Sequence, residues 1–303
     1  MFGISTAAKC IPTPISDMAE RFAKIYLEIT NVCNLHCSFC PGHDRPPTFL
    51  PIDRFRELAV KLRPYTRYLY LHVMGEPLMH PELSSILSVC KELDYSVIIT
   101  TNGTRLAACK EILLGSGALY KVNVSLHSME ANAGSDPEQY LTECADFVRD
   151  ASEKGILCVM RLWNESTPEL VGRNDQNIAV IGRLRELLPY EWEKNSKGYR
   201  IRHRLHLEWD HIFSWPDEDA ARVSDHRCRA LLDHFAVLCD GSVVPCCLDR
   251  NGGMMLGNLF AQTPEEILSS PMAEKIRLSL ANANPLPELC RRCGFAAAKF
   301  PIS

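Results

Sequence analysis

The sequence lacks the features that would place the chain in a membrane or outside the cell. No apolar run reaches the roughly 18 residues that a transmembrane helix needs. The first 21 residues lack the basic-then-apolar layout of a secretory signal, so export is not expected and we predict a cytoplasmic protein. A formal net charge of −4 over 303 residues gives no general attraction to nucleic acid or to an anionic membrane.

Cysteine is the residue that the sequence has in excess, with fourteen in the chain. In a secreted chain such a number would suggest disulfides, but a chain without a signal is expected to keep its thiols reduced. Reduced cysteines in this number indicate metal or iron–sulfur ligation.

Short apolar runs alternate with amphipathic stretches over the first two thirds of the chain. The runs are rich in Val, Ile, Leu and Tyr and are predicted to be strands; they cover residues 24–30, 67–74, 95–101, 120–127, 156–163 and 199–209. Helical spacing occurs at residues 53–62, 81–93, 105–114, 137–154 and 177–188. This alternation predicts a parallel α/β fold, either a barrel or a doubly wound sheet.

Polar residues at alternate strand positions favour the barrel. Strands of a doubly wound sheet are covered on both faces and are usually continuous apolar runs. The residues that share one strand face here are Tyr26, Glu28 and Thr30, then Tyr70, His72 and Met74, then Asn123, Ser125 and His127, with Arg161 on a fifth strand. Each alone could be a strand-end residue that reaches solvent, but four strands with this pattern indicate a polar lumen that holds a ligand.

The alternation stops at about residue 210, which predicts a core domain over 1–209 and a smaller domain over 210–303. Residues 235–247 are predicted to form a β-hairpin with Asp240 and Gly241 at its turn. Residues 263–280 have helical spacing, and cysteines reappear in this part of the chain.

The first candidate site is the run C-x3-C-x2-C formed by Cys33, Cys37 and Cys40. It follows the first predicted strand, where α/β barrels place their active sites. Structural zinc sites normally close with four ligands, whereas three cysteines leave one iron of a cubane cluster open to another ligand. Spacing alone leaves both kinds of site open.

Several segments together resemble the radical S-adenosylmethionine (AdoMet) superfamily. The run "CNLHCSFC" at 33–40 is similar to its cluster signature, and "MGEP" at 74–77 to its GEP-type motif. "TTNGT" at 100–104 and "VSLHS" at 124–128 resemble its ribose-contacting segments. The resemblance covers roughly residues 20–210 and implies a partial six-stranded barrel, with AdoMet as the external ligand of a 4Fe–4S cluster on the three cysteines. It also implies reductive cleavage of AdoMet to a 5′-deoxyadenosyl radical, which removes a hydrogen atom from a substrate.

The same resemblance implies a set of AdoMet contacts. Gly75, Glu76 and Pro77 would meet the amino group, and Thr101, Asn102, Gly103 and Ser125 the ribose. Arg161 lies where the family often binds the AdoMet carboxylate. Phe39 would pack near the adenine, or would be a loop residue buried against the barrel.

A second candidate site consists of Cys228, Cys246, Cys290 and Cys293. Two separated cysteines followed by C-x2-C also make zinc ribbons, so spacing alone does not decide between zinc and iron–sulfur. The region resembles the C-terminal extension called SPASM and its shorter form called twitch. Because only "GFAAAKFPIS" follows Cys293, the ligands of a second SPASM cluster are missing, and the resemblance to twitch implies one auxiliary 4Fe–4S cluster on these four cysteines.

The other cysteines fall into two groups. Cys239 and Cys247 lie near enough in sequence to replace one auxiliary ligand. The remaining ones are expected to be small core residues: Cys10, Cys90, Cys109, Cys144 and Cys158.

A fully ligated auxiliary cluster is expected to pass electrons rather than to bind substrate. It would oxidise the substrate radical, and a base would take the departing proton. The candidates predicted in the lumen, which the sequence does not rank, are Glu28, His72, His127 and Arg161. The resemblance also implies a flavodoxin- or ferredoxin-type electron donor.

The basic stretch at 194–206 bears on the substrate. If 199–209 is one strand, then Arg200, Arg202, Arg204 and His206 share one face. An inward face would predict an anionic or phosphorylated substrate, and an outward one a solvated face or a patch for RNA.

Three functions follow as hypotheses. The first is oxidation of a small molecule. The second is modification of a peptide or protein side chain, although only about 20 residues precede the first strand, whereas enzymes of ribosomal peptides often carry a leader-binding domain of about 80 residues. The third is a non-enzymatic zinc scaffold, against which the GEP, TNG and SLH segments argue.

Overall fold

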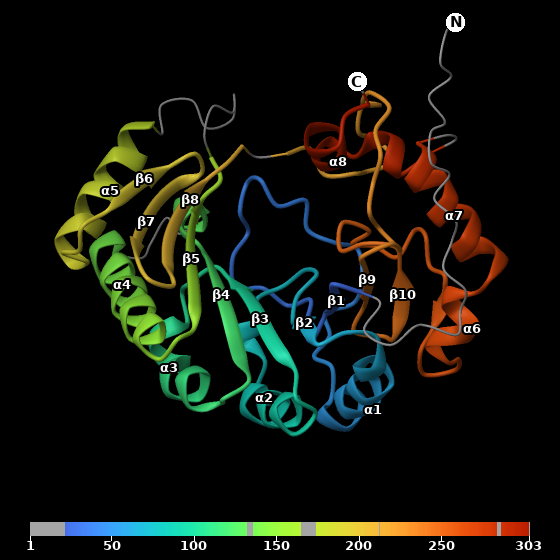
Figure 1. Ribbon diagram of the computed structural model, residues 1–303, viewed down its shortest axis with the longest axis horizontal. Coiled ribbons are helices and arrows are strands. Elements are labelled where there is room, and N and C mark those ends of the chain that lie inside the picture. The colour runs from blue at the N-terminus through green and yellow to red at the C-terminus, as the bar shows by residue number, and fades with distance from the viewer. Residues whose placement is uncertain (1–21, 132–135, 165–173, 212, 284–285, 303) are drawn as a thin grey trace, which may run out of the picture.

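A single twisted sheet runs through the molecule in the computed structural model (Figure 1). The structure describes residues 22–131, 136–164, 174–211, 213–283 and 286–302; Cys10 lies outside them. The eleven strands have the order β11-β10-β9-β1-β2-β3-β4-β5-β8-β7-β6. The strands at the two ends of this order do not pair with each other, so the sheet is open.

The predicted parallel core is present. Its strands are β1 (Lys24–Leu27), β2 (Tyr68–Tyr70), β3 (Ser96–Thr101), β4 (Leu119–Ser125), β5 (Leu157–Leu162) and β8 (Leu205–Trp209). The helices between them are α1 (Ile52–Leu62), α2 (Leu83–Glu92), α3 (Leu106–Gly115), α4 (Pro137–Glu153) and α5 (Asn174–Leu187). Short 3-10 turns occur at η2 (Arg63–Tyr65), η3 (Pro77–Met79) and η4 (Leu126–Ala131). Six parallel strands with helices on the outer face confirm the prediction of a partial barrel.

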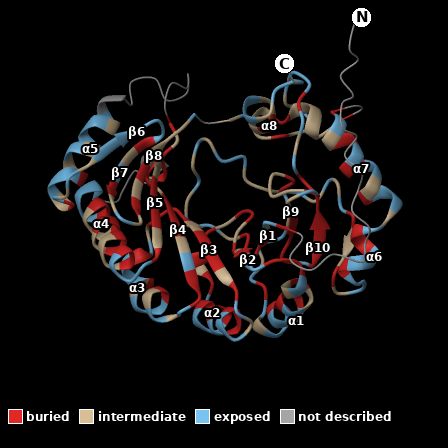
Figure 2. Ribbon diagram, in the orientation of Figure 1, coloured by how far each residue is buried: buried red, intermediate tan, exposed pale blue. Residues whose placement is uncertain are grey.

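The helices cover the outer face because each has one apolar side. In α1 the buried residues are Phe55, Leu58, Ala59 and Leu62, which recur at the spacing of one helical face. Figure 2 shows the helix faces toward the sheet as buried and the opposite faces as exposed. The outer layer therefore leaves the inner face of the sheet free for a site.

The predicted sixth strand is a hairpin instead. Residues 199–209 divide into β7 (Gly198–Arg202) and β8, which pair antiparallel, and β6 (Glu193–Asn195) pairs with β7. His203 and Arg204 form the turn, and Arg204 takes the left-handed φ of 59° that reverses the chain. Alternate residues of 199–209 therefore do not share one face.

Two arginines of this hairpin pair with glutamates and are not placed to bind an anionic substrate. Arg200 is exposed and pairs with Glu193 at 2.7 Å, and Arg202 pairs with Glu153 at 3.0 Å. The condition for predicting an anionic substrate from this stretch, one inward face, is therefore not met, and the alternative of a solvated face holds for Arg200 and Arg202.

The C-terminal region continues the same sheet. Strand β9 (His234–Val237) lies parallel to β1, and the hairpin to β10 (Ser242–Val244) turns at Asp240 and Gly241 as predicted. Strand β11 (Gly257–Asn258) completes this edge. Because β9 extends the barrel sheet, the division of the chain at residue 210 remains a prediction.

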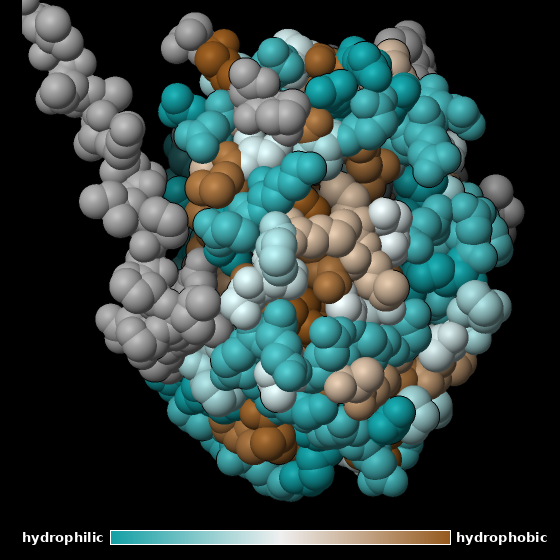
Figure 3. Space-filling model, turned by 90° about the vertical axis from the view of Figure 1, so that its right-hand side faces the viewer, coloured by the Kyte–Doolittle hydropathy of each residue, from teal (hydrophilic) through white to brown (hydrophobic). Residues whose placement is uncertain are grey.

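The helices of this region flank its hairpin. Instead of one helix over 263–280 there are α6 (Pro264–Leu268) and α7 (Pro271–Asn282), since Pro271 starts a new helix with Ser270 as its N-cap. The 3-10 turn η6 (Cys290–Arg292) and α8 (Gly294–Lys299) follow. On the side formed by α6 and α7, hydrophilic residues predominate and apolar residues gather in a few patches (Figure 3). Among the described residues, no helix is both long and apolar enough to cross a membrane.

Candidate active site

A cavity of about 520 Å³ lies between the inner face of the barrel and the C-terminal region. The barrel contributes Lys24, Tyr26, Tyr70, His72, Asn123, Ser125, His127, Arg161 and Trp163, and the loop after β1 contributes Phe39. The C-terminal region contributes Cys228, Cys246, Cys247, Cys290 and Cys293, with Phe213, Trp215 and His226 among the others. The predicted lumen therefore exists, and its far wall is built by the second cysteine set.

The three cysteines of the first site lie on the loop between β1 and α1. Cys33 and Cys40 are exposed and Cys37 is half-buried. The amide of Cys40 donates to the carbonyl of Cys37 at 3.0 Å, which curls the loop back on itself. Burial raises the pKa of Cys37 to about 11 against the opposing hydrogen bond of Ser128, and the neighbouring Cys40 and Cys33 contribute less to this rise. Three thiols thus gather at one rim of the barrel.

The Gly75–Pro77 segment packs directly against this loop. Gly75 has a φ of 73°, and an added Cβ would lie 2.6 Å from the carbonyl oxygen of Thr30. The amide of Glu76 donates to the carbonyl of Val32 at 2.8 Å. Only glycine allows so close an approach at this backbone angle, so the segment is fixed beside the first cysteine site.

Glu76 links that segment to the Thr101–Gly103 turn. Its carboxylate accepts the amide of Leu78 at 3.0 Å and the amide of Asn102 at 2.7 Å. The Asn102 side chain in turn donates to Asn34 at 2.9 Å. Burial raises the pKa of Glu76 to about 7 although these hydrogen bonds favour the charged form. The structure thus brings together the segments after β1, β2 and β3 that the sequence singled out.

The predicted AdoMet contacts divide into two groups. Phe39, Ser125 and Arg161 line the cavity. Gly75, Glu76, Pro77, Thr101, Asn102 and Gly103 do not line it and lie at the rim next to the cysteine loop. The lining residues are placed to contact a molecule bound in the cavity. The rim residues are placed to support the cysteine loop or to contact that molecule at the edge of the cavity.

An aromatic stack forms one wall of the cavity. The rings of Phe39 and His127 lie 4.8 Å apart, and His127 stacks on Trp163 at 6.5 Å with an interplanar angle of 8°. The guanidinium of Arg161 lies 4.5 Å from the centre of the Trp163 ring. Burial lowers the pKa of His127 to about 4, so this wall carries a neutral imidazole and one cation.

Four buried polar atoms along the cavity have no hydrogen-bond partner among the described residues. They are Nδ1 of His72, Oδ1 of Asn123, Nε of Arg161 and Nε2 of His226. Buried polar atoms are normally paired, and these four belong to residues that line one cavity. Lining residues with unpaired polar groups favour a polar ligand.

Glu28 does not line the cavity, which corrects its prediction as a lumen base. Its carboxylate is fully buried and accepts hydrogen bonds from both terminal guanidinium nitrogens of Arg45, Nη1 and Nη2, at 2.6 Å. It also accepts the amides of Met74 at 3.0 Å and Cys239 at 3.1 Å. The strand alternation placed it on the inner face correctly, but the loop carrying Arg45 covers this end of the strand.

The remaining base candidates do line the cavity. Burial, together with the positive charges of Arg161 and Lys24, lowers the pKa of His72 to about 3, so His72 and His127 are both neutral at physiological pH. Arg161 is a half-buried cation whose pKa is lowered by desolvation. The imidazoles can accept a proton only transiently, while Arg161 is placed to bind an anionic group.

The four C-terminal cysteines meet at the cavity although they come from three segments. Cys228 precedes β9 and Cys246 follows β10, while Cys290 begins the 3-10 turn η6 and Cys293 directly follows it. All four line the same cavity. Burial raises the pKa of Cys246, and the charges of Cys247, Cys228 and Cys290 raise it further. The donor set fits a cluster with four cysteine ligands.

The two substitute ligands separate in the structure. Cys247 lines the cavity and hydrogen-bonds Tyr26; burial raises its pKa to about 11, with Tyr26 and Lys24 acting in the opposite direction. Cys239 follows β9, donates its amide to Glu28 and does not line the cavity. Within the described residues, no group of three or more His, Cys, Asp or Glu side chains converges tightly enough to hold a single metal ion.

Several lining residues were not predicted. Lys24 lies two residues before Tyr26 on the same strand face, so alternation could have identified it. His226 is fully buried, with Nδ1 2.9 Å from the Ser224 carbonyl. Nothing in the local sequence around His226 or Phe213 indicates a cavity, because both belong to segments without regular structure.

Comparison with known proteins places these sites in a family context. Residues 27–166 match the family model of the radical SAM superfamily, and residues 228–294 match SPASM, an iron–sulfur cluster-binding domain. A probable GTP 3′,8-cyclase of Methanocella arvoryzae is 32% identical over 132 residues, or 43% of this chain and 41% of the relative. A GTP 3′,8-cyclase of Klebsiella pneumoniae is 30% identical over 121 residues, which are 37% of this chain and 36% of the relative. The matches span about two fifths of these curated relatives.

Solved structures share the fold over most of the chain. BtrN in complex with AdoMet and 2-DOIA is 17% identical with a TM-score of 0.54, covering 92% of this chain and 96% of BtrN. SuiB of Streptococcus suis bound to S-adenosylmethionine is 18% identical with a TM-score of 0.59, covering 85% and 68%. SuiB bound to the precursor peptide SuiA has a TM-score of 0.52 at 17% identity, covering 85% and 67%. With both family models matched and this fold shared, the chain belongs to the radical SAM superfamily and carries a C-terminal SPASM domain.

Proposed function

We propose that this radical SAM enzyme is an oxidoreductase that removes two electrons from a small molecule bound in the cavity. A radical SAM domain carries a 4Fe–4S cluster with AdoMet, and a SPASM domain carries auxiliary iron–sulfur clusters. Bound together, they supply a group that abstracts a hydrogen atom and an acceptor for one electron. The substrate would lose a hydrogen atom, a proton and an electron, which makes a carbonyl, an alkene or a crosslink.

The residues that would hold these groups follow from the site. Cys33, Cys37 and Cys40 would bind the AdoMet cluster. Phe39, Ser125 and Arg161 would contact AdoMet, with Gly75–Pro77 and Thr101–Gly103 at the rim. Cys228, Cys246, Cys290 and Cys293 would bind one auxiliary cluster, with Cys247 as the nearest alternative ligand.

One observation carries the proposal: a single cavity is lined at one end by Phe39 of the first cysteine loop and at the other by the C-terminal cysteines. A molecule in this cavity would contact the hydrogen-abstracting end and the electron-accepting end together. An auxiliary cluster that only stabilised the fold would not need to border the same space.

The charges of the cavity favour a substrate with an anionic group. Lys24 and Arg161 line the cavity, and neither forms an ion pair within the described ranges. The ammonium of Lys24 lies 5.5 Å from the ring centres of Tyr26 and Tyr70, at the end near Cys247. If Arg161 binds the AdoMet carboxylate, Lys24 is left for the substrate.

Modification of a peptide or protein side chain is the alternative. SuiB, which shares the fold, has been solved with its precursor peptide. Modification of RNA loses the support of the basic stretch, since Arg200 and Arg202 are held by Glu193 and Glu153. The electron donor stays a prediction: a flavodoxin or ferredoxin.

A deuterium-transfer screen tests the proposal. The anaerobically reconstituted enzyme would be incubated with AdoMet, a reductant and deuterated small molecules, with and without an anionic group. We expect deuterium in 5′-deoxyadenosine and a product two hydrogens lighter than its substrate. A product with the mass of its substrate would overturn the oxidoreductase proposal, and deuterium transfer only from peptides would favour the alternative.

A further inference from the structure

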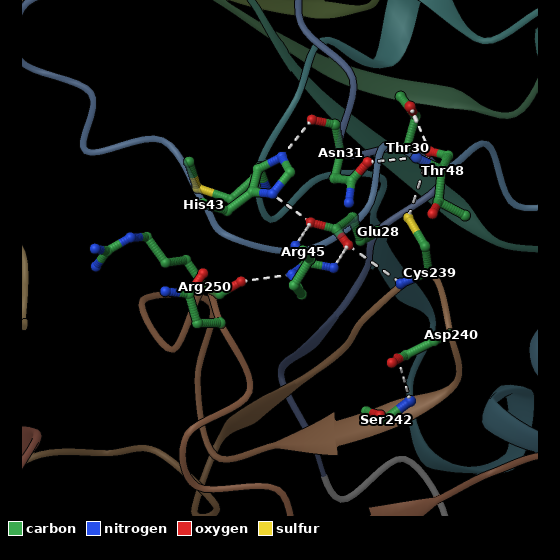
Figure 4. Close-up of polar contacts among 12 residues, drawn as sticks. Glu28, Thr30, Asn31, His43, Arg45, Thr48, Cys239, Asp240, Ser242 and Arg250 are labelled. Carbon is green, nitrogen blue, oxygen red and sulfur yellow. Dashed lines mark hydrogen bonds and ion pairs between the residues drawn. The ribbon is translucent and has the colours of Figure 1, made fainter.

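The buried carboxylate of Glu28 joins three segments that are far apart in the sequence (Figure 4). It accepts two hydrogen bonds from Arg45, both at 2.6 Å, one from the amide of Met74 and one from the amide of Cys239. Both carboxylate oxygens are therefore fully used, and Glu28 is 0% exposed. A carboxylate in this state holds the backbone rather than taking a proton from a ligand.

Arg45 extends this contact to the C-terminal hairpin. Its Nε donates to the carbonyl of Arg250 at 2.7 Å. Beside it, the amide of Asp44 donates to Asn251 at 3.0 Å, and the Asn251 amide donates back to Asp44 at 2.7 Å. The Arg250 side chain in turn donates to the Pro216 carbonyl at 3.1 Å and pairs with Asp217. The loop of the first cysteine site is thus tied to the loop after β10.

Each tied segment carries a functional group a few residues away. Arg45 lies five residues after Cys40, Arg250 lies four after Cys246, and Met74 precedes Gly75. A buried bidentate ion pair is costly to break on one side only, because the other charge is then left unpaired. Through Arg45, the buried Glu28–Arg45 pair therefore links the segments that carry the two cysteine sites.

We propose that Glu28 and Arg45 are positioning residues that fix the separation of the AdoMet-cluster loop and the auxiliary-cluster hairpin. This inference rests on the proposed function, in which one substrate contacts both ends of the cavity. A small displacement of one end would leave hydrogen abstraction possible while slowing the electron uptake that completes the reaction.

Two variants and a matched control test the pair. Arg45→Met removes the contacts of this side chain with Glu28 and with the carbonyl of Arg250. Glu28→Gln removes the negative charge with little change of shape. As the control, Arg56→Met breaks the exposed Arg56–Glu92 ion pair of 2.6 Å. The readouts are hydrogen exchange in peptides covering 33–47 and 239–254, and the ratio of oxidised product to 5′-deoxyadenosine.

For Arg45→Met we expect faster exchange in both peptides and a product ratio lower by about tenfold, with 5′-deoxyadenosine still formed. Arg45→Lys keeps the positive charge but cannot form the bidentate contact, so its exchange rates and product ratio should lie between those of Arg45→Met and the wild type. Arg56→Met should match the wild type in both readouts. If Arg45→Met fails to fold, Arg45→Lys and Glu28→Gln give the same test.

Two results would overturn the inference. One is an Arg45→Met enzyme with wild-type exchange and a wild-type ratio. The other is a Glu28→Gln enzyme that loses product while its exchange is unchanged, which would make Glu28 a proton acceptor. If the wild type yields no oxidised product at all, the proposed function fails, whereas the exchange data still decide whether the pair fixes the two loops.

Discussion

The two cysteine sites lie beside one cavity but are built in opposite ways: the second is part of the cavity lining, whereas the first contributes only Phe39 of its loop. The first lies within eight residues of one loop, and two of its three thiols are exposed. The second draws Cys228, Cys246, Cys290 and Cys293 from three segments, and none of the four is exposed. A local, open site with three thiols suits a cluster that must admit another ligand, and a closed site with four suits one that exchanges only electrons.

The largest effect is expected from removing the first site. Replacing Cys33, Cys37 and Cys40 by alanine should abolish AdoMet cleavage, because these three cysteines are proposed to be the ligands of the AdoMet cluster. Iron and sulfide should fall from about eight to about four of each per chain. Cys90→Ala, a buried core position on α2, should leave both quantities unchanged, and cleavage retained in the triple variant would contradict the assignment.

Removing the second site should separate cleavage from product formation. Cys290→Ala with Cys293→Ala should still form 5′-deoxyadenosine but no oxidised product, because the electron from the substrate radical has no acceptor. Iron should again fall to about four per chain. Product formation at the wild-type rate would show that these cysteines do not hold the electron acceptor. Zinc in place of iron in the wild-type protein would refute the assignment of iron–sulfur clusters to both cysteine sites.

Charge at the auxiliary end of the cavity should have a smaller effect. Lys24→Met should raise the KM of an anionic substrate by about tenfold, the value of one hydrogen bond to a charged group. Lys24→Arg should recover most of the loss since it keeps the charge. Equal KM values for all three proteins would mean that the substrate carries no anionic group near Lys24.

The contrast between the sites also explains what the sequence could predict. The first site follows from C-x3-C-x2-C after a strand, and the segments after β2 and β3 fall beside it because parallel strands end on one edge of the sheet. The second was predicted only through a resemblance, since nothing local draws Cys228 toward Cys290. The amide of Cys228 donates to the carbonyl of Leu280 at 3.0 Å, and the amide of Val223 donates to the carbonyl of Arg291 at 2.8 Å. Contacts between segments this far apart in the sequence leave no local pattern.

The errors have the same origin. Alternation placed Glu28 on the inner face, but it could not show that Arg45 covers that end of the strand. It made 199–209 one strand because apolar and basic residues alternate, while the left-handed turn at Arg204 reverses the chain. Periodicity predicts which face of a strand a residue occupies. Which other residues pack against that face depends on tertiary contacts that periodicity does not show.

The smallest effect concerns pH at the other end of the cavity, where His127 stacks between Phe39 and Trp163. Burial lowers its folded pKa to about 4, whereas the unfolded value is about 6.5. Between pH 8 and pH 5 the unfolded chain gains a proton here that the folded chain does not, so the free energy of unfolding falls by about 2 kcal/mol as pH falls. His127→Phe, which keeps the ring stack, should lose less stability over this range than the wild type by that amount, in urea unfolding of the two cluster-loaded proteins. Parallel pH profiles would mean that His127 takes up its proton at the same pH in the folded and the unfolded protein, which would contradict a neutral imidazole in this wall of the cavity.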